Sequence, residues 1–406
     1  MPSPPIKSMM EVSALDPEAR LDPHQKLKAL REVCPAFRDE MSKAWLLTRY
    51  GDVRSTVNDR SMLRHPRHAE EGSIARHLLD EADDDTEGRN SSILFLDEPD
   101  HSRVRLPLTK AFYARVNAMK GDIETIVDQV IDRAPGAGRF DLIADIAVPI
   151  PILVIARILG VEEARIGDFR DWSEAVILSL NPMRTPDDTA RLEWGAERLN
   201  AYFDETMAAR RANPRDDLIS DMVAVQEAGA QISDDELIRN LEALLVGGNL
   251  TTTDLIGNGV WLFLNHPDEM KKLRADSRLA GAAVEEVLRF ESPVAITTRV
   301  LPEDREIGGC PMKGHQSVWT SLHSANRDEA LFEEPDVFDI TRKKVPHIAF
   351  GGGSHICIGA PLARIEAKHA FVKLFEKYPN MTLPVQDLVW RTLPFFRGLE
   401  TLFVEV

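Results

Sequence analysis

One cysteine of this chain lies in a glycine-rich run that could hold a metal ion. Residues 350–359 read FGGGSHICIG, and a helical pattern begins at Ala360. Glycine lacks a Cβ and accepts positive φ, so the backbone can bend closely around a bound group. The amide N–H groups of the loop and the amino end of the following helix would stabilise negative charge on the Cys357 sulfur. The run therefore predicts a thiolate that ligates a metal from a loop.

The spacing Phe-Gly-x-Gly-x-His-x-Cys-x-Gly resembles the haem-binding signature of the cytochrome P450 family, in which a cysteine thiolate ligates the haem iron. The resemblance implies that Cys357 is the iron ligand and that Phe350, His355 and Gly359 belong to the cofactor-binding loop. The alternative is a glycine-rich turn with a buried, inert cysteine. Six matched positions at fixed spacing favour the haem interpretation.

Two glycines and three threonines lie within a helical pattern at residues 246–253 (VGGNLTTT). A glycine inside a helix costs about 1 kcal/mol relative to alanine, so Gly247 and Gly248 indicate either a function or a tight helix crossing. The P450 family has a similar Gly-x-acid-Thr segment on its oxygen-activating helix. The resemblance maps Thr251 onto the threonine that helps to supply protons there. Thr251 and Cys357 are therefore the predicted catalytic residues.

The sequence departs from that family at Leu250, which stands where the family has an acid. Leucine cannot relay a proton, Asn249 does not titrate, and Asp254 lies one turn further along the helix. The resemblance implies a haem-thiolate monooxygenase, but the missing acid keeps two other interpretations open. One is a haem-thiolate reductase or peroxide-driven enzyme, and the other is a non-catalytic haem protein that only binds ligands.

Four basic residues match positions at which the family binds the haem propionates. His101 and Arg105 are spaced i, i+4 on a predicted helix, so they share a face. With Arg299 and His355 they resemble the family's donors to the two carboxylates. The alternative for each residue alone is a solvated basic face. The implied cofactor is haem b, iron protoporphyrin IX.

A third motif of the family is a Glu-x-x-Arg pair, here Glu286 and Arg289. Their spacing places them on one helix face, although surface pairs of this kind are common and contribute little. The resemblance adds Arg342 as a third member. The implied role of the three residues is structural, because they would fix the cysteine loop.

The resemblance also implies a pocket for a small hydrophobic substrate, into whose C–H bond one oxygen atom from O2 is inserted. For two of its members, Phe395 and Phe396, ordinary core packing is the alternative. The residues in matching places are Gly247, Gly248, Val294, Ala295, Thr297, Phe395 and Phe396.

Composition excludes several other functions for this chain of 406 residues. Its formal net charge is −17, which argues against nucleic-acid binding. The three cysteines are odd in number and far apart, which fits a reducing compartment. Residues 241–264 are the most apolar helical run, but they contain Glu242 and Asp254 and so fail as a membrane span. We expect a cytoplasmic protein without a membrane anchor, similar to the soluble bacterial P450s.

The periodicity predicts a mainly α fold with a minor β region, a P450-like single α-rich domain that encloses haem over residues 21–406. Residues 1–20 are expected to be a loose lead-in, and residues 60–92 a polar surface segment. Ser233 and Glu236 have capping-box spacing and start a helix that should reach Asn265. Further expectations are a helix over 279–290 and β segments at 295–301, 305–307, 316–321 and from 383 onward.

Electrons must come from a separate protein, because the sequence has neither a phosphate-binding loop nor a flavin domain. We expect a ferredoxin-type donor served by a ferredoxin reductase. Four cations predict where such an acidic donor would dock: Arg103, Lys110, Lys343 and Lys344.

Overall fold

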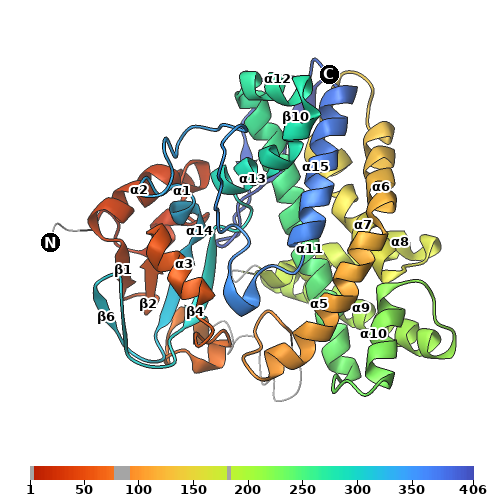
Figure 1. Cartoon of the computed structure of the whole chain (residues 1–406), viewed down its shortest axis with the longest axis horizontal. Coiled ribbons are helices and arrows are strands. Elements are labelled where there is room, and N and C mark those ends of the chain that lie inside the picture. The colour runs from red at the N-terminus through yellow and green to blue at the C-terminus, as the bar shows by residue number, and fades with distance from the viewer. Residues whose placement is uncertain (1–3, 77–91, 181–183) are drawn as a thin grey trace.

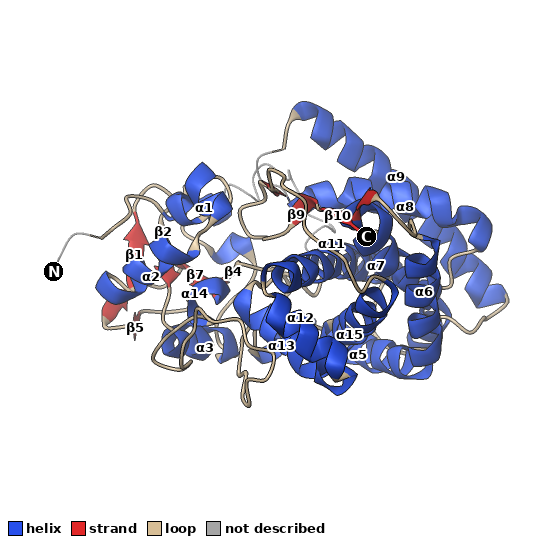
Figure 2. Cartoon of the chain, turned by 90° about the horizontal axis from the view of Figure 1, so that it is seen from above, coloured by secondary structure: helices blue, strands red, loops and turns tan. Residues whose placement is uncertain are grey.

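The computed structural model describes residues 4–76, 92–180 and 184–406. Figures 1 and 2 both place a small sheet with the first three helices at one end of the molecule and a larger bundle of helices at the other. The mainly α fold with a minor β region is confirmed. The helices, with the numbering of Figure 1, are α1 (Pro17–Leu21), α2 (His24–Val33), α3 (Tyr50–Asn58), α5 (Asp100–Ala118), α6 (Lys120–Arg133), α7 (Pro149–Leu159), α8 (Ile166–Val176), α9 (Pro186–Ala212), α10 (Leu218–Glu227), α11 (Asp234–Asn265), α12 (Pro267–Ala275), α13 (Ala280–Phe290), α14 (Leu322–Ala325) and α15 (Ala360–Lys377).

The largest sheet has four strands in the order β1-β2-β7-β4. Strand β2 runs parallel to β7, whereas the other two pairings are antiparallel. The strands of the whole structure are β1 (Ala36–Asp39), β2 (Ala44–Leu47), β3 (Arg139–Asp141), β4 (Ile296–Val300), β5 (Arg305–Ile307), β6 (Cys310–Met312), β7 (Ser317–Ser321), β8 (Val389–Trp390), β9 (Leu399–Thr401) and β10 (Phe403–Glu405).

Helix α11 crosses the centre of the bundle in both views (Figures 1 and 2). It begins as its sequence predicts, because Ser233 and Glu236 form a reciprocal capping box. It ends at Asn265, before Pro267 opens α12. A proline favours such a boundary because it restricts the residue before it.

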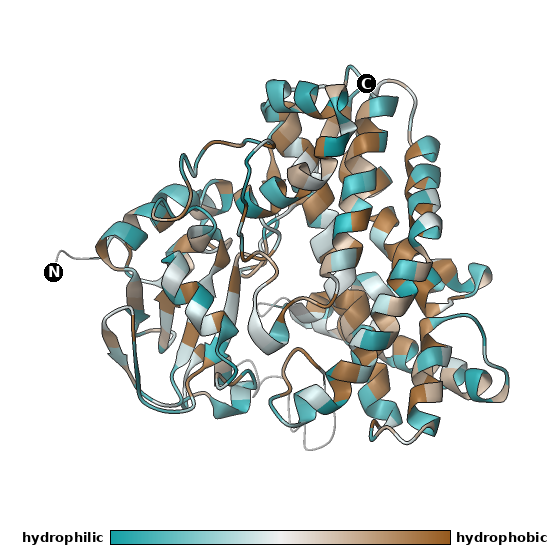
Figure 3. Ribbon diagram, in the orientation of Figure 1, coloured by the Kyte–Doolittle hydropathy of each residue, from teal (hydrophilic) through white to brown (hydrophobic). Residues whose placement is uncertain are grey.

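Two apolar clusters hold the bundle together, and α11 contributes to both. Its residues between Leu237 and Val246 pack into one cluster, and its residues from Leu255 to Phe263 pack into the other. In Figure 3 hydrophobic residues gather where the central helices face one another, whereas α12 is largely hydrophilic. Residues 247–254 of α11 lie between the two clusters. This middle segment is therefore the part of α11 that apolar core packing does not occupy.

The N-terminal segment differs from the expected loose lead-in. Residues 9–12 form a 3-10 turn with a capping box, and Pro17 opens α1. Ile6, Met9 and Val12 are buried against the sheet. These three apolar residues are scattered among polar ones, so their spacing did not predict that the segment packs against the sheet. The predicted single domain over residues 21–406 stays a prediction.

Within the described ranges, no helix is long and apolar enough to span a membrane. The helix α11 is long enough, but its acidic and amide residues break the apolar run, as the sequence analysis expected.

Candidate active site

The cysteine loop (residues 350–359) is bent by two glycines in the left-handed region. Gly351 and Gly353 have φ values of 68° and 64°, which L side chains rarely adopt. A Cβ at Gly353 would also lie 2.6 Å from a carbonyl oxygen of α3. The N–H of Cys357 donates to the carbonyl of Phe350 at 3.0 Å and closes the loop. The bend places the cysteine directly before the start of α15.

The Cys357 sulfur lies beside the backbone N–H groups of Gly359 and Ala360. These two donors and the Arg105 guanidinium favour the thiolate, but burial outweighs them and raises the pKa of the thiol. Cys357 as a whole residue is nevertheless exposed, although protein atoms surround its sulfur closely. A thiol in this position ionises when it coordinates a metal ion. The loop therefore offers an open ligand position.

Glu286, Arg289 and Arg342 come together as the sequence analysis expected. Arg289 donates from Nε and Nη2 to the two carboxylate oxygens of Glu286 at 2.8 and 2.7 Å, and both side chains are fully buried. Arg342 Nε lies 3.4 Å from the same carboxylate. Two charges can be buried because bidentate geometry and further backbone acceptors satisfy both.

Two further contacts connect α13 to the cysteine loop, and sequence analysis missed both. Asn326 accepts from Arg289 through its carbonyl and from the N–H of Ile348 through its side chain, at 3.2 and 2.8 Å. Glu285 accepts from Arg364 of α15 at 2.6 and 2.9 Å. Hydrogen bonds from Arg364 and a neighbouring histidine lower the pKa of Glu285 to about 2 against the effect of burial. Both ends of the loop are therefore held.

The four predicted propionate donors gather beside this loop. The rings of His101, in the first turn of α5, and His355 have centroids 4.2 Å apart. Arg105 donates to the carbonyl of Ile356, within the loop itself. Arg299 is buried on β4 and donates to the carbonyl of Thr298 at 2.8 Å. Neither Arg105 nor Arg299 forms an ion pair with a described acid.

A fifth base, Arg64, joins this group and was missed by sequence analysis. It donates to Thr297 Oγ1 at 2.9 Å and to the carbonyl of Thr298. Burial lowers its pKa to about 10, and burial together with the Arg64 charge lowers the pKa of Arg299 to about 9. Burial and four neighbouring bases lower the pKa of His355 to about 2. We call Arg64, His101, Arg105, Arg299 and His355 the basic cluster.

The middle of α11 is open on one side. Gly247 is exposed although it lies at the centre of a 32-residue helix. A Cβ on Gly247 or Gly248 would meet no atom within 4 Å, so a tight helix crossing does not explain the two glycines. Thr251 is half-buried, and its hydroxyl donates to the Gly247 carbonyl at 2.6 Å. Leu250 beside it is buried.

The other predicted pocket residues form two pairs between distant segments. Val294 and Phe396 form an antiparallel bridge, and the Ala295 N–H donates to the Phe395 carbonyl at 2.9 Å. Phe395 also packs edge-on against Trp319, with ring centroids 5.1 Å apart, which supports its core interpretation. The Thr297 hydroxyl accepts a hydrogen bond from Arg64 in the basic cluster, and its place in the substrate pocket stays a prediction.

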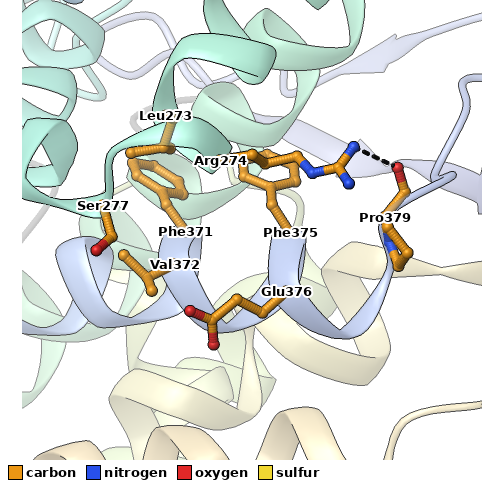
Figure 4. A pocket seen from close by; sticks show the side chains of 8 residues that line it. All are labelled: Leu273, Arg274, Ser277, Phe371, Val372, Phe375, Glu376 and Pro379. Carbon is orange, nitrogen blue, oxygen red and sulfur yellow. Dashed lines mark hydrogen bonds between the residues drawn. The ribbon is translucent and has the colours of Figure 1, made fainter.

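A separate pocket of about 210 Å³ lies between α12 and α15. Figure 4 shows Phe371 and Phe375 at its wall and Arg274 donating to the carbonyl of Pro379, at 2.8 Å. Phe371 follows Ala360 by three helical turns, so this pocket is remote from the cysteine loop. It contains none of the predicted site residues.

Arg103 differs from its expected role as a free docking charge. Its guanidinium pairs with Asp100 at 2.9 Å and with Glu236 at the start of α11. Lys110, Lys343 and Lys344 are exposed. Three of the four expected cations thus remain available to a partner.

Comparison with known proteins identifies the family. The family model "Cytochrome P450" matches residues 191–389. Cytochrome P450 107B1 of Saccharopolyspora erythraea is 37% identical over 97% of both chains. The monooxygenase PikC of Streptomyces venezuelae is 35% identical over 98% of this chain and 94% of its own. The chain belongs to the cytochrome P450 family. The crystal structure of myxobacterial P450 CYP267B1 with myristic acid has a TM-score of 0.88 and 35% identity over 98% of this chain and 99% of that one.

This P450 is therefore an oxidoreductase of the monooxygenase type whose cofactor is haem. The described residues fit that group on two counts. Both ring nitrogens of His101 are buried without a hydrogen-bond partner, and Nδ1 is 3.6 Å from Glu98, too far for a hydrogen bond. The bases around His101 repel one another, so the basic cluster is suited to an anion with several acceptor oxygens. The two haem propionates have that chemistry.

Proposed function

We propose that this P450 inserts one oxygen atom from O2 into a C–H bond of a small hydrophobic molecule, with electrons from a ferredoxin-type protein and its reductase. The observation that carries the proposal is the basic cluster beside an accessible Cys357. Haem, when bound, supplies the activation of dioxygen. Cys357 would ligate its iron, and the basic cluster would hold its propionates.

The other side of the site would be formed by α11. Gly247 and Gly248 leave open space for a substrate, and the Thr251 hydroxyl lies next to them. The paired segments at Val294 and Phe396 would orient an apolar molecule and exclude water from it. A related P450 with 35% identity has been crystallised with myristic acid, which supports a hydrophobic substrate. Orientation and a dry site are the protein's main contributions to such chemistry.

The electron donor would dock beside the cysteine loop. Leu106 and Ile356 are exposed, at 67% and 48% of their surface. Lys110 shares a helix face with Leu106, because the two are spaced i, i+4 on α5. With Lys343 and Lys344, this region offers an apolar centre and positive charge to an acidic ferredoxin. Complementary charge mainly raises the association rate.

The deciding experiment is product analysis with myristic acid as the first probe, followed by a set of hydrophobic molecules that shift the Soret band. A hydroxylated product that requires O2, ferredoxin and reductase supports the proposal. Turnover with peroxide or NADH alone would support a peroxide-driven enzyme or a reductase, which Leu250 keeps as the second candidate. Binding without any turnover would support a ligand-binding protein.

The docking surface is tested by the rate of haem reduction. We expect the rate to fall as ionic strength rises, because salt screens exposed charges. Lys343→Glu with Lys344→Glu should slow reduction, whereas Lys271→Glu on α12 should not. Reduction that is insensitive to salt and to both reversals would contradict this surface.

A further inference from the structure

A cavity of about 430 Å³ borders α11 at the position where the usual acid is missing. Asn249, Leu250 and Thr253 line it from α11, and Arg391 and Glu400 line it from the C-terminal segment. The pair Arg170 and Glu174 of α8 also lines this cavity, and both are partly exposed. The rest of the lining is largely apolar, with Ile143, Val148 and Leu178 among it. A cavity of this volume is large enough to hold several water molecules beside its polar groups.

One side chain in this lining has an unused hydrogen-bonding group. Asn249 is 2% exposed, and its Nδ2 has no hydrogen-bond partner among the described residues. A buried amide without a partner is costly, so a water molecule in the cavity would stabilise it. By contrast, Thr253 already donates to the carbonyl of Ala147 at 3.2 Å. The Asn249 amide therefore gives the cavity one polar group on α11 that a water molecule can bind.

Asp254 lies behind this lining and contacts it through Arg391. It is 1% exposed, and its Oδ1 lies 3.0 Å from Nε of Arg391, which lines the cavity. Its Oδ2 has no partner. Burial raises the pKa of Asp254 to about 6 although Arg391 opposes the change, and Arg391 is the charged group that faces it. A Cβ at Gly398 would overlap the Asp254 carboxylate, so the fold reserves room for this acid.

The helix places Asp254 close to the residues that matter for proton delivery. It follows Leu250 by four residues and Thr251 by three, so all three lie along one side of α11. Side chains at these spacings have Cβ atoms about 5–6 Å apart. An acid that is absent at position 250 is therefore present one turn away, beside a route to solvent.

We propose that Asp254, held by Arg391, relays protons from the cavity to the Thr251 side of α11 in place of the acid that Leu250 lacks. The proposal rests on the proposed function, because oxygen chemistry is what consumes the protons. The neutral carboxyl releases its proton to water next to Thr251, and the carboxylate regains one from water that enters the cavity. Each proton delivered is thus replaced by one from solvent, and Asp254 ends unchanged. Asp254 exchanges protons only with water and does not touch substrate or cofactor, so it is a positioning residue.

The alternative is that Asp254 and Arg391 form only a structural ion pair. The molecule contains a matched pair of that kind, Arg210 and Asp217, which is also buried and has a 2.7 Å contact. That pair joins the end of α9 to the start of α10, and Asp217 also caps α10. A variant of Asp217 therefore controls for loss of a buried Asp–Arg pair that has no residue in the lining of this cavity.

The test measures oxygen consumption without an organic substrate, so that no substrate has to be known. Reduction of O2 to H2O2 uses two electrons, supplied here by NADPH through a plant-type ferredoxin and its reductase, and two protons, which come from solvent. Rates are recorded between pH 5 and pH 8. The rate at which the carbon-monoxide complex forms after reduction reports electron delivery alone. It serves as a control for each variant.

We expect the parent rate to fall as pH rises past about 6, because the protonated donor is lost. Asp254→Asn should lower the rate at pH 7 several-fold and remove this step, whereas Asp254→Glu should keep it. Arg391→Gln should move the step to higher pH, since the opposing charge is gone. Asp217→Asn should keep the parent profile. A parent profile in both Asp254→Asn and Arg391→Gln overturns the relay.

A second measurement needs no oxygen chemistry. Because the folded pKa of Asp254 is raised from 3.8 to about 6, the folded protein binds more protons than the unfolded chain between these values, and this group's stabilising effect falls as pH rises through that window. Asp254→Asn should therefore gain thermal stability relative to the parent from pH 4 to pH 6. If the difference in thermal stability between variant and parent is the same at pH 4 and pH 6, Asp254 does not titrate in this range. A parent without the thiolate carbon-monoxide band overturns the proposed function, which is a separate outcome.

Discussion

The two sides of the candidate site differ in how closely they follow the P450 family. On the side of Cys357 all the motif residues are present, and the structure brings them into contact. On the side of α11 the glycines and Thr251 are kept, but Leu250 replaces the acid. A thiolate loop needs many contacts at once, so losing one member would disturb the rest. Proton delivery needs one titratable group near enough to water, so that group can move along the helix.

The largest expected effect tests the Cys357 side. Cys357→His should abolish the red-shifted Soret band of the reduced carbon-monoxide complex, because an imidazole replaces the thiolate. The measurement is the difference spectrum of parent and variant. Cys310→Ser, a half-buried cysteine in β6, should leave the band in place. A Cys357→His protein that kept the thiolate band would refute the ligand assignment.

The second effect tests whether the contacts on that side act together. Glu286→Gln leaves Arg289 charged in a fully buried site, and breaking such a pair costs about 3–5 kcal/mol. We expect this loss in the free energy of unfolding, measured with denaturant, together with loss of haem during purification. Asp268→Asn, which removes an exposed i, i+3 partner of Lys271, should change neither. A stable Glu286→Gln protein that retained haem would mean that the loop holds itself.

The third effect concerns the residue that sequence analysis missed. Arg64→Gln removes a half-buried charge from the basic cluster, and a hydrogen bond to a charged group contributes about 1.5–3 kcal/mol. We expect weaker haem retention, measured by transfer of haem to apomyoglobin, and a lower reduction potential. Arg67→Gln changes an exposed arginine three residues away and should match the parent. Equal retention in both variants would remove Arg64 from the cofactor site.

The helices and the cysteine side were largely predictable because their signals are local. The capping box at Ser233 fixed the start of α11, and Pro267 follows its end. The strand 305–307 agrees with β5, and the helix expected over 279–290 is α13. Such features depend on neighbouring residues, so spacing alone reveals them.

The missed features depend on contacts between distant segments. Arg64 belongs to a stretch that was expected to be polar surface, but it donates to Thr297, more than 200 residues later. Arg103 looked free until Glu236 at the start of α11 paired with it. Residues 77–91 of the expected polar surface segment lie outside the described residues. A single sequence contains no sign of these pairings, because the residues around a polar side chain do not identify its partner in a distant segment.

The smallest expected effect tests the α11 side. Leu250→Asp should raise the product formed per electron if proton delivery limits coupling, because it restores an acid beside Thr251. With Asp254 already supplying protons, we expect a gain of about tenfold or less, equal to about 1.4 kcal/mol in the barrier. Leu250→Asn is the matched control, since it is polar but does not titrate. Thr251→Ala should increase peroxide release.

Two other results would change the comparison between the sides. If Leu250→Asp and Leu250→Asn both weaken substrate binding and leave coupling unchanged, Leu250 shapes an apolar pocket and protons reach the site without it. In that case Leu250→Asp should also leave the pH step of Asp254 in place, because the relay never used position 250. If Thr251→Ala keeps parent coupling, Thr251 has no part in proton delivery, and the reductase and peroxide-driven functions gain support. Measuring product per electron for these three variants separates the outcomes, because only a working acid next to Thr251 makes the Asp and Asn variants differ.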